Sequence, residues 1–177
     1  MPVTLVLGGA RSGKSRYAQR SAEFLARGNG IEPIFVATAT AGDAEMTDRI
    51  ARHRADRGGD WRTVESPLRL AETLARMKPE DVAVVDCLTI WLANSMAEAD
   101  GHADRVAGLV PALAACEARV WLVSNEVGWG IVPDNALARR FRDEAGLLHQ
   151  AIAAMAMETI LMVAGLPLRL PAAASEQ

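Results

Sequence analysis

The feature that most constrains the fold of this chain is the segment 8–15, which reads GGARSGKS. An apolar run at 3–7 precedes the segment, and apolar residues recur at helical spacing through 14–26. A strand, a glycine-rich turn and a helix are therefore expected in direct succession. Backbone amides in such a turn can surround a phosphate, and the positive N-terminal end of the helix attracts the same group. This context favours a phosphate-binding loop over a glycine-rich turn that binds nothing.

Two side chains of this loop suit the chemistry of a nucleoside triphosphate. Lys14 can reach the β and γ phosphate oxygens, and the hydroxyl of Ser15 can ligate magnesium. Such a site also needs an acidic group at the end of a neighbouring strand, which holds the water shell of the metal. Asp86 closes the apolar run DVAVVD and meets this requirement. The alternative is that Asp86 caps the helix that follows, a common position for aspartate.

Strand and helix patterns alternate along the rest of the chain. Strands are predicted at 33–37, 61–64, 81–86, 119–123 and 159–164, with an edge strand at 166–170. Helices are predicted at 43–57, 67–77, 88–96, 105–116 and 136–157, with a polar loop at 98–104 and a glycine-containing loop at 125–133. The alternation predicts an α/β fold, built on a mostly parallel sheet with helices on both faces.

Length and composition limit the classes of function. The 177 residues suit one domain, expected at 1–170, followed by a flexible tail at 171–177. A formal net charge of −3 provides no basic field for nucleic acid. Cys87 and Cys116 form no CxxC pair, and the sequence shows neither a signal sequence nor an apolar run of the roughly 20 residues that span a bilayer. We therefore expect a cytoplasmic protein with free thiols that acts on small ligands.

A cluster of cations between residues 49 and 62 departs from this acidic balance. It consists of His53 and five arginines: Arg49, Arg52, Arg54, Arg57 and Arg62. His53 continues the helical spacing of Met46 and Ile50, which turns it inward between flanking arginines. A neutral imidazole beside such cations can act as a nucleophile toward phosphorus, with the arginines stabilising the transferring group. The alternative is a solvated helix face with salt bridges to nearby carboxylates.

Five segments together resemble one known family. They are GGARSGKS at 8–15, FVATAT at 35–40, RIARHRADRGGDWRTVESP at 49–67, VVDCLTIWLAN at 84–94 and VSNEVGWGIVPDNALARRFRDEAG at 123–146. In order and content they resemble the bifunctional adenosylcobinamide kinase/adenosylcobinamide-phosphate guanylyltransferase family of adenosylcobalamin (vitamin B12) biosynthesis. The resemblance covers nearly the whole chain and implies a RecA-like P-loop fold.

The resemblance implies two reactions on one corrinoid substrate. ATP or GTP phosphorylates the aminopropanol hydroxyl of adenosylcobinamide, and GMP from GTP is then transferred to that phosphate with release of pyrophosphate. In the family the GMP passes through a covalent guanylyl-histidine, and the matching histidine is His53 in this chain. The resemblance also implies Mg²⁺ as cofactor and a homo-oligomer, notably a trimer.

The resemblance further implies the residues of the site. Lys14 and His53 would be catalytic, and Ser15 and Asp86 would lie on the magnesium side. The nucleotide-binding residues would be Gly8, Gly9, Ala10, Arg11, Ser12, Gly13, Lys14, Ser15, Ala37, Thr38, Ala39, Arg54, Ala55, Asp56, Arg57, Glu65 and Asp86.

The loop after the predicted strand at 119–123 is the candidate substrate loop. It carries Asn125, Glu126, Gly128 and Gly130, and such strand ends are where open α/β sheets bind ligands. A structural turn in which Glu126 caps a helix is the alternative.

Three further residues receive no catalytic role from the sequence. His102, in the polar loop, and His149, in a helix of packing residues, are expected to be structural or solvated. His149 also departs from the family, in which an amide is more usual, and Trp129 stands where a smaller apolar residue is expected.

Two other functions compete with the one that the resemblance implies. The first is a P-loop kinase of another small alcohol, in which the arginine-rich helix is a lid and no covalent nucleotide forms. The second is a nucleotide-dependent switch or ATPase module with protein partners, which binding of a corrinoid would exclude.

Overall fold

The computed structural model describes residues 2–40 and 61–171. The predicted helix at 43–57 lies outside the described residues, and so do His53, Arg54, Ala55, Asp56 and Arg57. Residues 172–177, which make up nearly all of the predicted tail, also lie outside them.

Within these ranges, strands and helices alternate as predicted. The strands are β1 (Val3–Gly8), β2 (Ile34–Ala37), β3 (Arg62–Glu65), β4 (Val82–Asp86), β5 (Arg119–Asn125), β6 (Glu158–Val163) and β7 (Leu166–Leu170). The helices are α1 (Lys14–Asn29), α3 (Leu70–Ala75), α4 (Leu88–Ala97), α5 (His102–Ala115) and α6 (Ala136–Met155).

The described strands form one sheet in the order β3-β2-β4-β5-β1-β6-β7. All neighbours pair in parallel except β6 and β7, which form an antiparallel hairpin at one edge. Parallel strands all end at the same edge of a sheet, so the segments after β1, β2, β4 and β5 meet there. Because β1 and β4 are separated by β5, the phosphate-binding loop and Asp86 lie on two strands with one strand between them.

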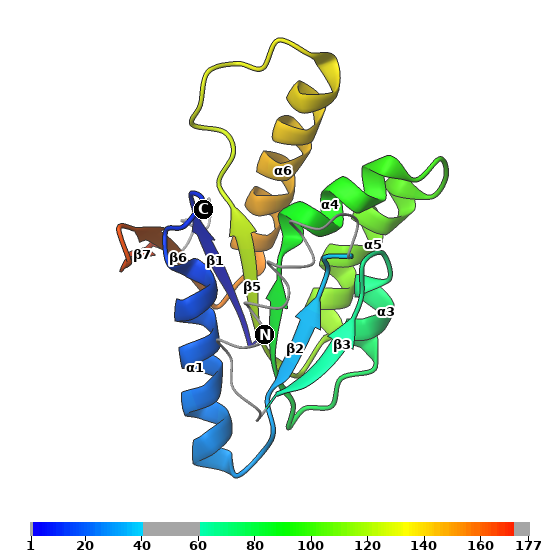
Figure 1. Ribbon diagram of the computed structural model, residues 1–177. Helices are drawn as coiled ribbons and strands as arrows, with labels where there is room; N and C mark the ends of the chain where they lie inside the picture. The colour runs from blue at the N-terminus through cyan, green and yellow to red at the C-terminus, as the bar shows by residue number, and fades with distance from the viewer. Residues whose placement is uncertain (1, 41–60, 172–177) are drawn as a thin grey trace, which may run out of the picture.

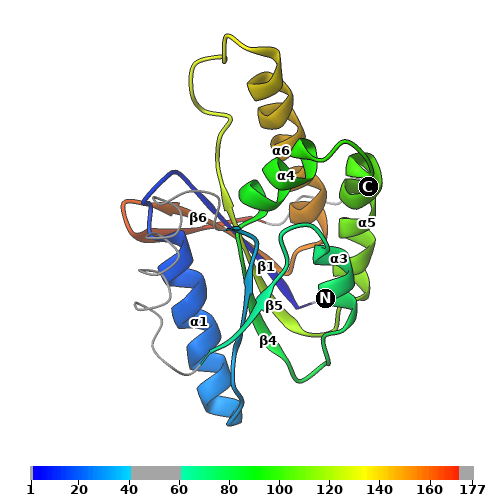
Figure 2. The same cartoon turned by 45° about the vertical axis from the view of Figure 1, so that its right-hand side comes forward.

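Helices cover both faces of the sheet, which confirms the predicted architecture. Figures 1 and 2 show α1 on one face and α3, α4, α5 and α6 on the other. Helix α1 packs closely because Ala18, Ala22 and Ala26, spaced one turn apart, are all buried against Val84 and other sheet residues. The opposite face buries larger side chains, among them Trp91, in a second apolar cluster.

The prediction of a helix over 67–77 is wrong at both ends, since α3 spans only Leu70–Ala75. Two carbonyls that a longer helix would use are instead bound by side chains of α4. The Leu68 carbonyl accepts a hydrogen bond from Trp91 Nε1 at 3.0 Å, and the Pro67 carbonyl accepts one from Asn94 Nδ2 at 3.2 Å. These tertiary contacts hold the start of the segment in a non-helical conformation.

The predicted polar loop at 98–104 is also too long, because α5 begins at His102. His102 is partly buried there, and its ring bonds Ser95 on α4 and Glu144 on α6. The residue is therefore structural, as expected, but it is helical and links three helices.

Cys87 and Cys116 are free thiols, as expected, and both are buried. Among the described residues, no helix is long and apolar enough to cross a membrane.

Candidate nucleotide-binding site

The phosphate-binding loop, residues 8–15, connects β1 directly to α1. The amide of Ser12 donates to the Gly9 carbonyl at 3.3 Å, which closes the turn, and no side chain caps the first turn of α1. Lys14 is the first residue of α1; its side chain is 7% exposed, and its Nζ donates to the Gly9 carbonyl at 2.8 Å. The ammonium group therefore lies against the inner side of the loop, where a phosphate would be held.

Two glycines of the loop occupy positions that do not suit a side chain, Gly8 for lack of space and Gly13 chiefly because of its backbone conformation. A Cβ on Gly8 would lie 2.5 Å from Ser12 Oγ and 2.7 Å from the Met162 carbonyl oxygen. Gly13 has φ of 96°, in the left-handed region, and a Cβ there would lie 3.3 Å from the Cα of Gly165. The loop is thus braced by the β6–β7 turn, whose Gly165 amide also donates to the Ser12 carbonyl at 3.0 Å.

Asp86 ends β4 beside the ends of two further strands. The register pairs Ala37 with Asp86 and also with Glu65, so these three predicted site residues form one row across β4, β2 and β3. Asp86 continues the alternation of Val82 and Val84, which pack in the cluster under α1, so its side chain points to the face of the sheet that carries Lys14. Glu65, at the outer end of the row, is exposed.

Thr38 links the ends of β2 and β4. Its hydroxyl donates to the Cys87 carbonyl at 2.8 Å and accepts from the Cys87 amide at 2.7 Å, and its carbonyl accepts from Asn94 Nδ2 at 2.8 Å. Thr38 is fully buried. Thr38, a predicted nucleotide-pocket residue, therefore fixes the backbone next to Asp86, whereas its neighbour Ala39 is half-buried.

Two buried polar atoms beside the loop have no hydrogen-bond partner in the described part of the chain: Ser12 Oγ and Asp86 Oδ2. Buried polar atoms are normally paired, and unpaired ones indicate a ligand, an ion or water. The two residues implied for the ion, Asp86 and Ser15, offer oxygen atoms, and such donors suit magnesium. The residues present therefore fit the implied ion.

The competing role of Asp86 as a helix cap is not found. The N-cap of α4 is Cys87, and no side-chain hydrogen bond caps this helix. Burial raises the pKa of the Cys87 thiol, and the adjacent Asp86 carboxylate raises it further. Cys87 is consequently a neutral thiol, bonded to Thr89 Oγ1 at 3.0 Å, and is poorly suited to act as a nucleophile.

The candidate substrate loop follows β5, and with the start of α6 it rises above the carboxyl edge of the sheet (Figure 1). Asn125 is the last residue of β5, and its Nδ2 bonds Thr89 Oγ1 at 3.2 Å. Glu126 does not cap a helix, since α6 is capped by Asn135, whose side chain accepts from the Ala138 amide. Gly128 and Gly130 are exposed.

A buried polar pair beneath this loop was not predicted from the sequence. Ser124 is fully buried in β5, and its Oγ lies 2.7 Å from Nε2 of His149 on α6. Burial lowers the pKa of His149, and the Glu126 carboxylate, 3.9 Å from Nδ1, partly opposes this. The Ser124 hydroxyl near the end of an otherwise apolar strand is a sign in the sequence that a buried polar contact exists. The sequence does not identify the partner, because His149 lies 25 residues further on.

The histidine on α5 belongs to a separate polar cluster. His102 Nε2 lies 2.6 Å from Glu144 Oε2, and Arg140 Nε donates to Glu144 Oε1 at 2.7 Å. Burial would raise the pKa of Glu144, but hydrogen bonds from Arg140 and His102 outweigh it and lower that pKa. The cluster joins helices away from the phosphate loop and stabilises their packing.

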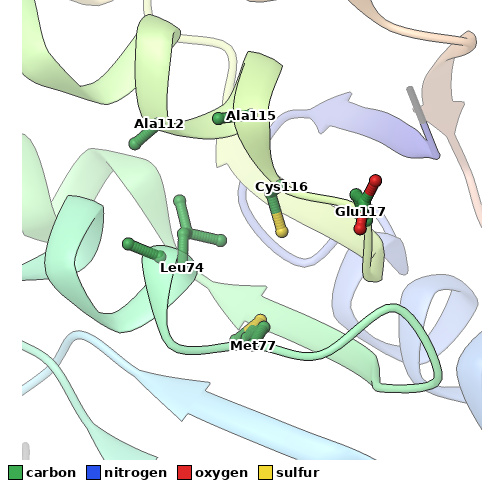
Figure 3. Close-up of a pocket in the computed structure, with 7 residues that line it drawn as sticks. Leu74, Met77, Ala112, Ala115, Cys116 and Glu117 are labelled. Carbon is green, nitrogen blue, oxygen red and sulfur yellow. The ribbon is translucent and has the colours of Figure 1, made fainter.

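A cavity of about 180 Å³ between α3 and α5 lies at the other end of the sheet. Figure 3 shows Leu74 and Met77 on one side of it and Cys116 on the other. Met77 and Cys116 come just before β4 and β5 begin, so the cavity opens at the amino edge. It is therefore separate from the nucleotide site.

Comparison with known proteins shows which family the chain resembles over nearly its whole length. The family model described as cobinamide kinase / cobinamide phosphate guanyltransferase matches residues 4–170. The bifunctional adenosylcobalamin biosynthesis protein CobP of Pseudomonas aeruginosa is 49% identical over 171 residues, covering 94% of this chain and 95% of that protein. CobU of Escherichia coli, described in the same words, is 38% identical over 182 residues, covering 94% and 98%.

Among solved structures, one described as an ATPase domain is similar in fold. It has a TM-score of 0.50 at 13% identity, over 90% of this chain and 68% of that chain. At this identity the likeness concerns the fold alone, and it confirms the expected RecA-like P-loop architecture.

Proposed function

The chain belongs to the cobinamide kinase / cobinamide phosphate guanyltransferase family, and we propose from this that it catalyses both reactions of adenosylcobinamide activation. It phosphorylates adenosylcobinamide with ATP or GTP, and it then transfers GMP from GTP to give adenosylcobinamide-GDP and pyrophosphate. The observation that carries the proposal is the braced phosphate loop with the Lys14 ammonium against it, together with Asp86 Oδ2, which has no hydrogen-bond partner among the described residues. The family match supports cobinamide as the acceptor of the transferred group.

In the first reaction, the substrate hydroxyl oxygen attacks the γ phosphorus. A new phosphorus–oxygen bond forms, the bond between the γ phosphorus and the β-phosphate oxygen breaks, and the nucleoside diphosphate leaves. The amides of residues 8–15 hold the phosphates, and Lys14 stabilises the negative charge that develops on the transferring group. The hydroxyl proton passes to solvent or to a nearby base as the new bond forms.

In the second reaction, a nitrogen of His53 attacks the α phosphorus of GTP and pyrophosphate leaves. The phosphate of the corrinoid then attacks the same phosphorus, which forms the diphosphate and restores His53. Arg54 and Arg57, with Ala55 and Asp56 between them, follow His53 and are proposed to line the guanine nucleotide site together with Glu65.

A bound magnesium ion would neutralise part of the phosphate charge. Ser15 and Asp86 are the residues proposed to hold it, directly or through water. The Asp86 side chain faces the same side of the sheet as α1, and within 2–40 and 61–171 its Oδ2 has no hydrogen-bond partner.

The corrinoid is proposed to contact the loop that carries Asn125, Glu126, Gly128 and Gly130. This loop leaves the same sheet edge as the phosphate loop, since Gly8 and Asn125 are paired in the register of β1 and β5. We further propose that the protein is cytoplasmic and forms a homo-oligomer, with a trimer as the expected form.

The test of the covalent step is labelling with GTP that carries ³²P at the α phosphate. The protein is denatured, and the bound label should be labile in acid and stable in alkali, as a phosphoramidate is. His53→Ala should abolish labelling, whereas His102→Gln, the matched control on α5, should retain it. Absence of label in a wild-type protein that binds GTP would favour the simpler function, a P-loop kinase without a covalent nucleotide.

A further inference from the structure

Ser124, His149 and Glu126 form a chain of polar groups beneath the candidate substrate loop. Ser124 Oγ lies 2.7 Å from Nε2 of His149, and Nδ1 of the same ring lies 3.9 Å from Glu126 Oε2. The negative carboxylate favours the tautomer with its proton on Nδ1, so the Ser124 hydroxyl donates to Nε2. The order of groups is that of a hydrolase triad.

Burial rules out nucleophilic chemistry for this arrangement. Ser124 is fully buried, so no substrate carbonyl or phosphate can reach its Oγ. His149, 7% exposed, is likewise inaccessible. Of the three residues, Glu126 is the one that reaches the surface, and its side chain is 20% exposed. Ser124 and His149 can therefore hold the Glu126 carboxylate in place.

Glu126 is held from both sides. Its Oε1 accepts a hydrogen bond from the Gly128 amide at 2.7 Å, and its Oε2 faces the His149 ring. Gly128 makes this close approach possible, since a Cβ there would lie 2.9 Å from Glu126 Oε1. Oε1 of the carboxylate therefore holds the turn of residues 126–128 together, while Oε2 is oriented by the His149 ring.

The backbone of Glu126 connects this turn to the phosphate loop. Its amide donates to the Gly8 carbonyl at 3.0 Å, one residue beyond the point where Gly8 and Asn125 pair. Asn125, in turn, is bonded to Thr89 on the helix after Asp86. These bonds anchor the start of the 126–130 segment to the ends of β1 and α4, so His149 and Glu126 act on the part of the segment beyond that anchor.

We propose that His149 is a positioning residue for the phosphoryl-transfer reaction: through Ser124 and Glu126 it fixes the 126–130 segment in the orientation that receives the acceptor alcohol. The identity of that alcohol rests on the proposed function; the positioning does not. His149 stays neutral near pH 7, because burial lowers its pKa by more than the Glu126 carboxylate, the charged group beside it, raises it. Protonation of the ring would attract Glu126 Oε2 and compete with the bond from Gly128.

The fluorescence of Trp129 reports on the conformation of the 126–130 segment. It lies within the segment, and it is 76% exposed. Its emission is obtained by subtracting the spectrum of Trp129→Phe, which retains Trp61, Trp91 and Trp121. In the wild type this emission should titrate with a midpoint below about 6.5, the ordinary pKa of histidine. In His149→Gln, which keeps a polar group near Ser124 but has no ring to protonate, the titration should disappear.

Steady-state kinetics test the consequence for the reaction. His149→Leu should raise the KM for cobinamide about tenfold, as a displaced substrate-positioning segment does, with the Kd for ATP changed less than about twofold. His149→Gln should recover most of the loss. Ser124→Ala, which removes only the hydroxyl, should give a smaller effect in the same direction.

The outcomes separate the two proposals. A Trp129 titration that persists unchanged in His149→Gln, or an ATP affinity that falls in parallel with the cobinamide KM, overturns the positioning role. If the wild type binds ATP and shows the titration but phosphorylates no cobinamide, the proposed function fails and the positioning role stands.

Discussion

Thr38 and Cys87 exchange two hydrogen bonds through one hydroxyl group. Thr38 Oγ1 donates to the Cys87 carbonyl at 2.8 Å and accepts from the Cys87 amide at 2.7 Å, and both residues are buried. The residue before Cys87 is Asp86, the carboxylate expected near magnesium. The hydroxyl thus determines where the end of β4 lies relative to the end of β2.

Replacing Thr38 with valine should therefore harm both stability and activity. Valine has the same shape but leaves the buried Cys87 amide unpaired, at a cost of about 2 kcal/mol in the free energy of unfolding, whereas the Cys87 carbonyl keeps the hydrogen bond from the Trp91 amide at 3.1 Å. Urea unfolding measures this cost, and kcat/KM for ATP should fall as Asp86 moves. Thr38→Ser keeps the hydroxyl and serves as the control; equal losses in both variants would contradict this account.

Lys14 should be essential for phosphoryl transfer, whereas Lys78 should not. Lys14→Ala removes the cation beside the phosphate loop, and kcat/KM for ATP is expected to fall by about 10²–10³-fold. Lys78 is exposed in the turn before β4, so Lys78→Ala removes the same charge away from the site. Both variants should keep the circular dichroism spectrum of the wild type. A similar loss in both would mean that overall charge, not position, matters.

Asp86 should make nucleotide binding depend on magnesium. The wild type is expected to bind ATP more tightly with Mg²⁺ than with a chelator, and Asp86→Asn should reduce that difference because it removes the charged oxygen donor. Isothermal calorimetry with and without EDTA measures both affinities. Asp81→Asn, just before the same strand begins, is the matched control. An undiminished magnesium effect in Asp86→Asn would assign the ion to other residues.

Two glycine-to-alanine changes should have opposite effects. In Gly8→Ala the new Cβ would lie 2.5 Å from Ser12 Oγ and 2.7 Å from a backbone oxygen of Met162, so a loss of about 2–3 kcal/mol is expected. Gly108 lies inside α5, and no atom of the described residues lies within 4 Å of the added Cβ, so Gly108→Ala should stabilise the protein by up to about 1 kcal/mol. Thermal and urea unfolding check both. A stable Gly8→Ala protein would show that the phosphate loop can rearrange.

The Glu144 cluster should contribute stability that depends on pH. In the folded protein the pKa of the Glu144 carboxyl is lowered, so as pH falls the unfolded state takes up a proton before the folded state does. The stabilising contribution is therefore complete above about pH 4.5, the ordinary pKa of glutamate, and is lost below it. The difference in the free energy of unfolding between wild type and Glu144→Gln should therefore be constant near pH 7 and shrink below about 4.5. Glu80→Gln, which makes the same change of charge at an exposed position, is the matched control.

The sequence by itself determined the parts of this protein that depend on local pattern. The glycine loop between an apolar run and a helical run, the alternation of strands and helices, and the acidic end of DVAVVD all follow from neighbouring residues. They therefore predicted the α/β architecture, the position of Lys14 and the position of Asp86 as an acidic group at the end of a strand. The family was also evident from motifs that each occupy a short stretch.

Only the tertiary structure decided the contacts between distant segments. The late start of the predicted helix at 67–77 depends on Trp91 and Asn94, which lie more than one element away and take its carbonyls. The pairing of Ser124 with His149, and the bracing of Gly13 by Gly165, have the same origin. Local pattern cannot specify such contacts, because hydrogen bonds and excluded volume act between atoms that the chain brings together only when the whole sheet has formed.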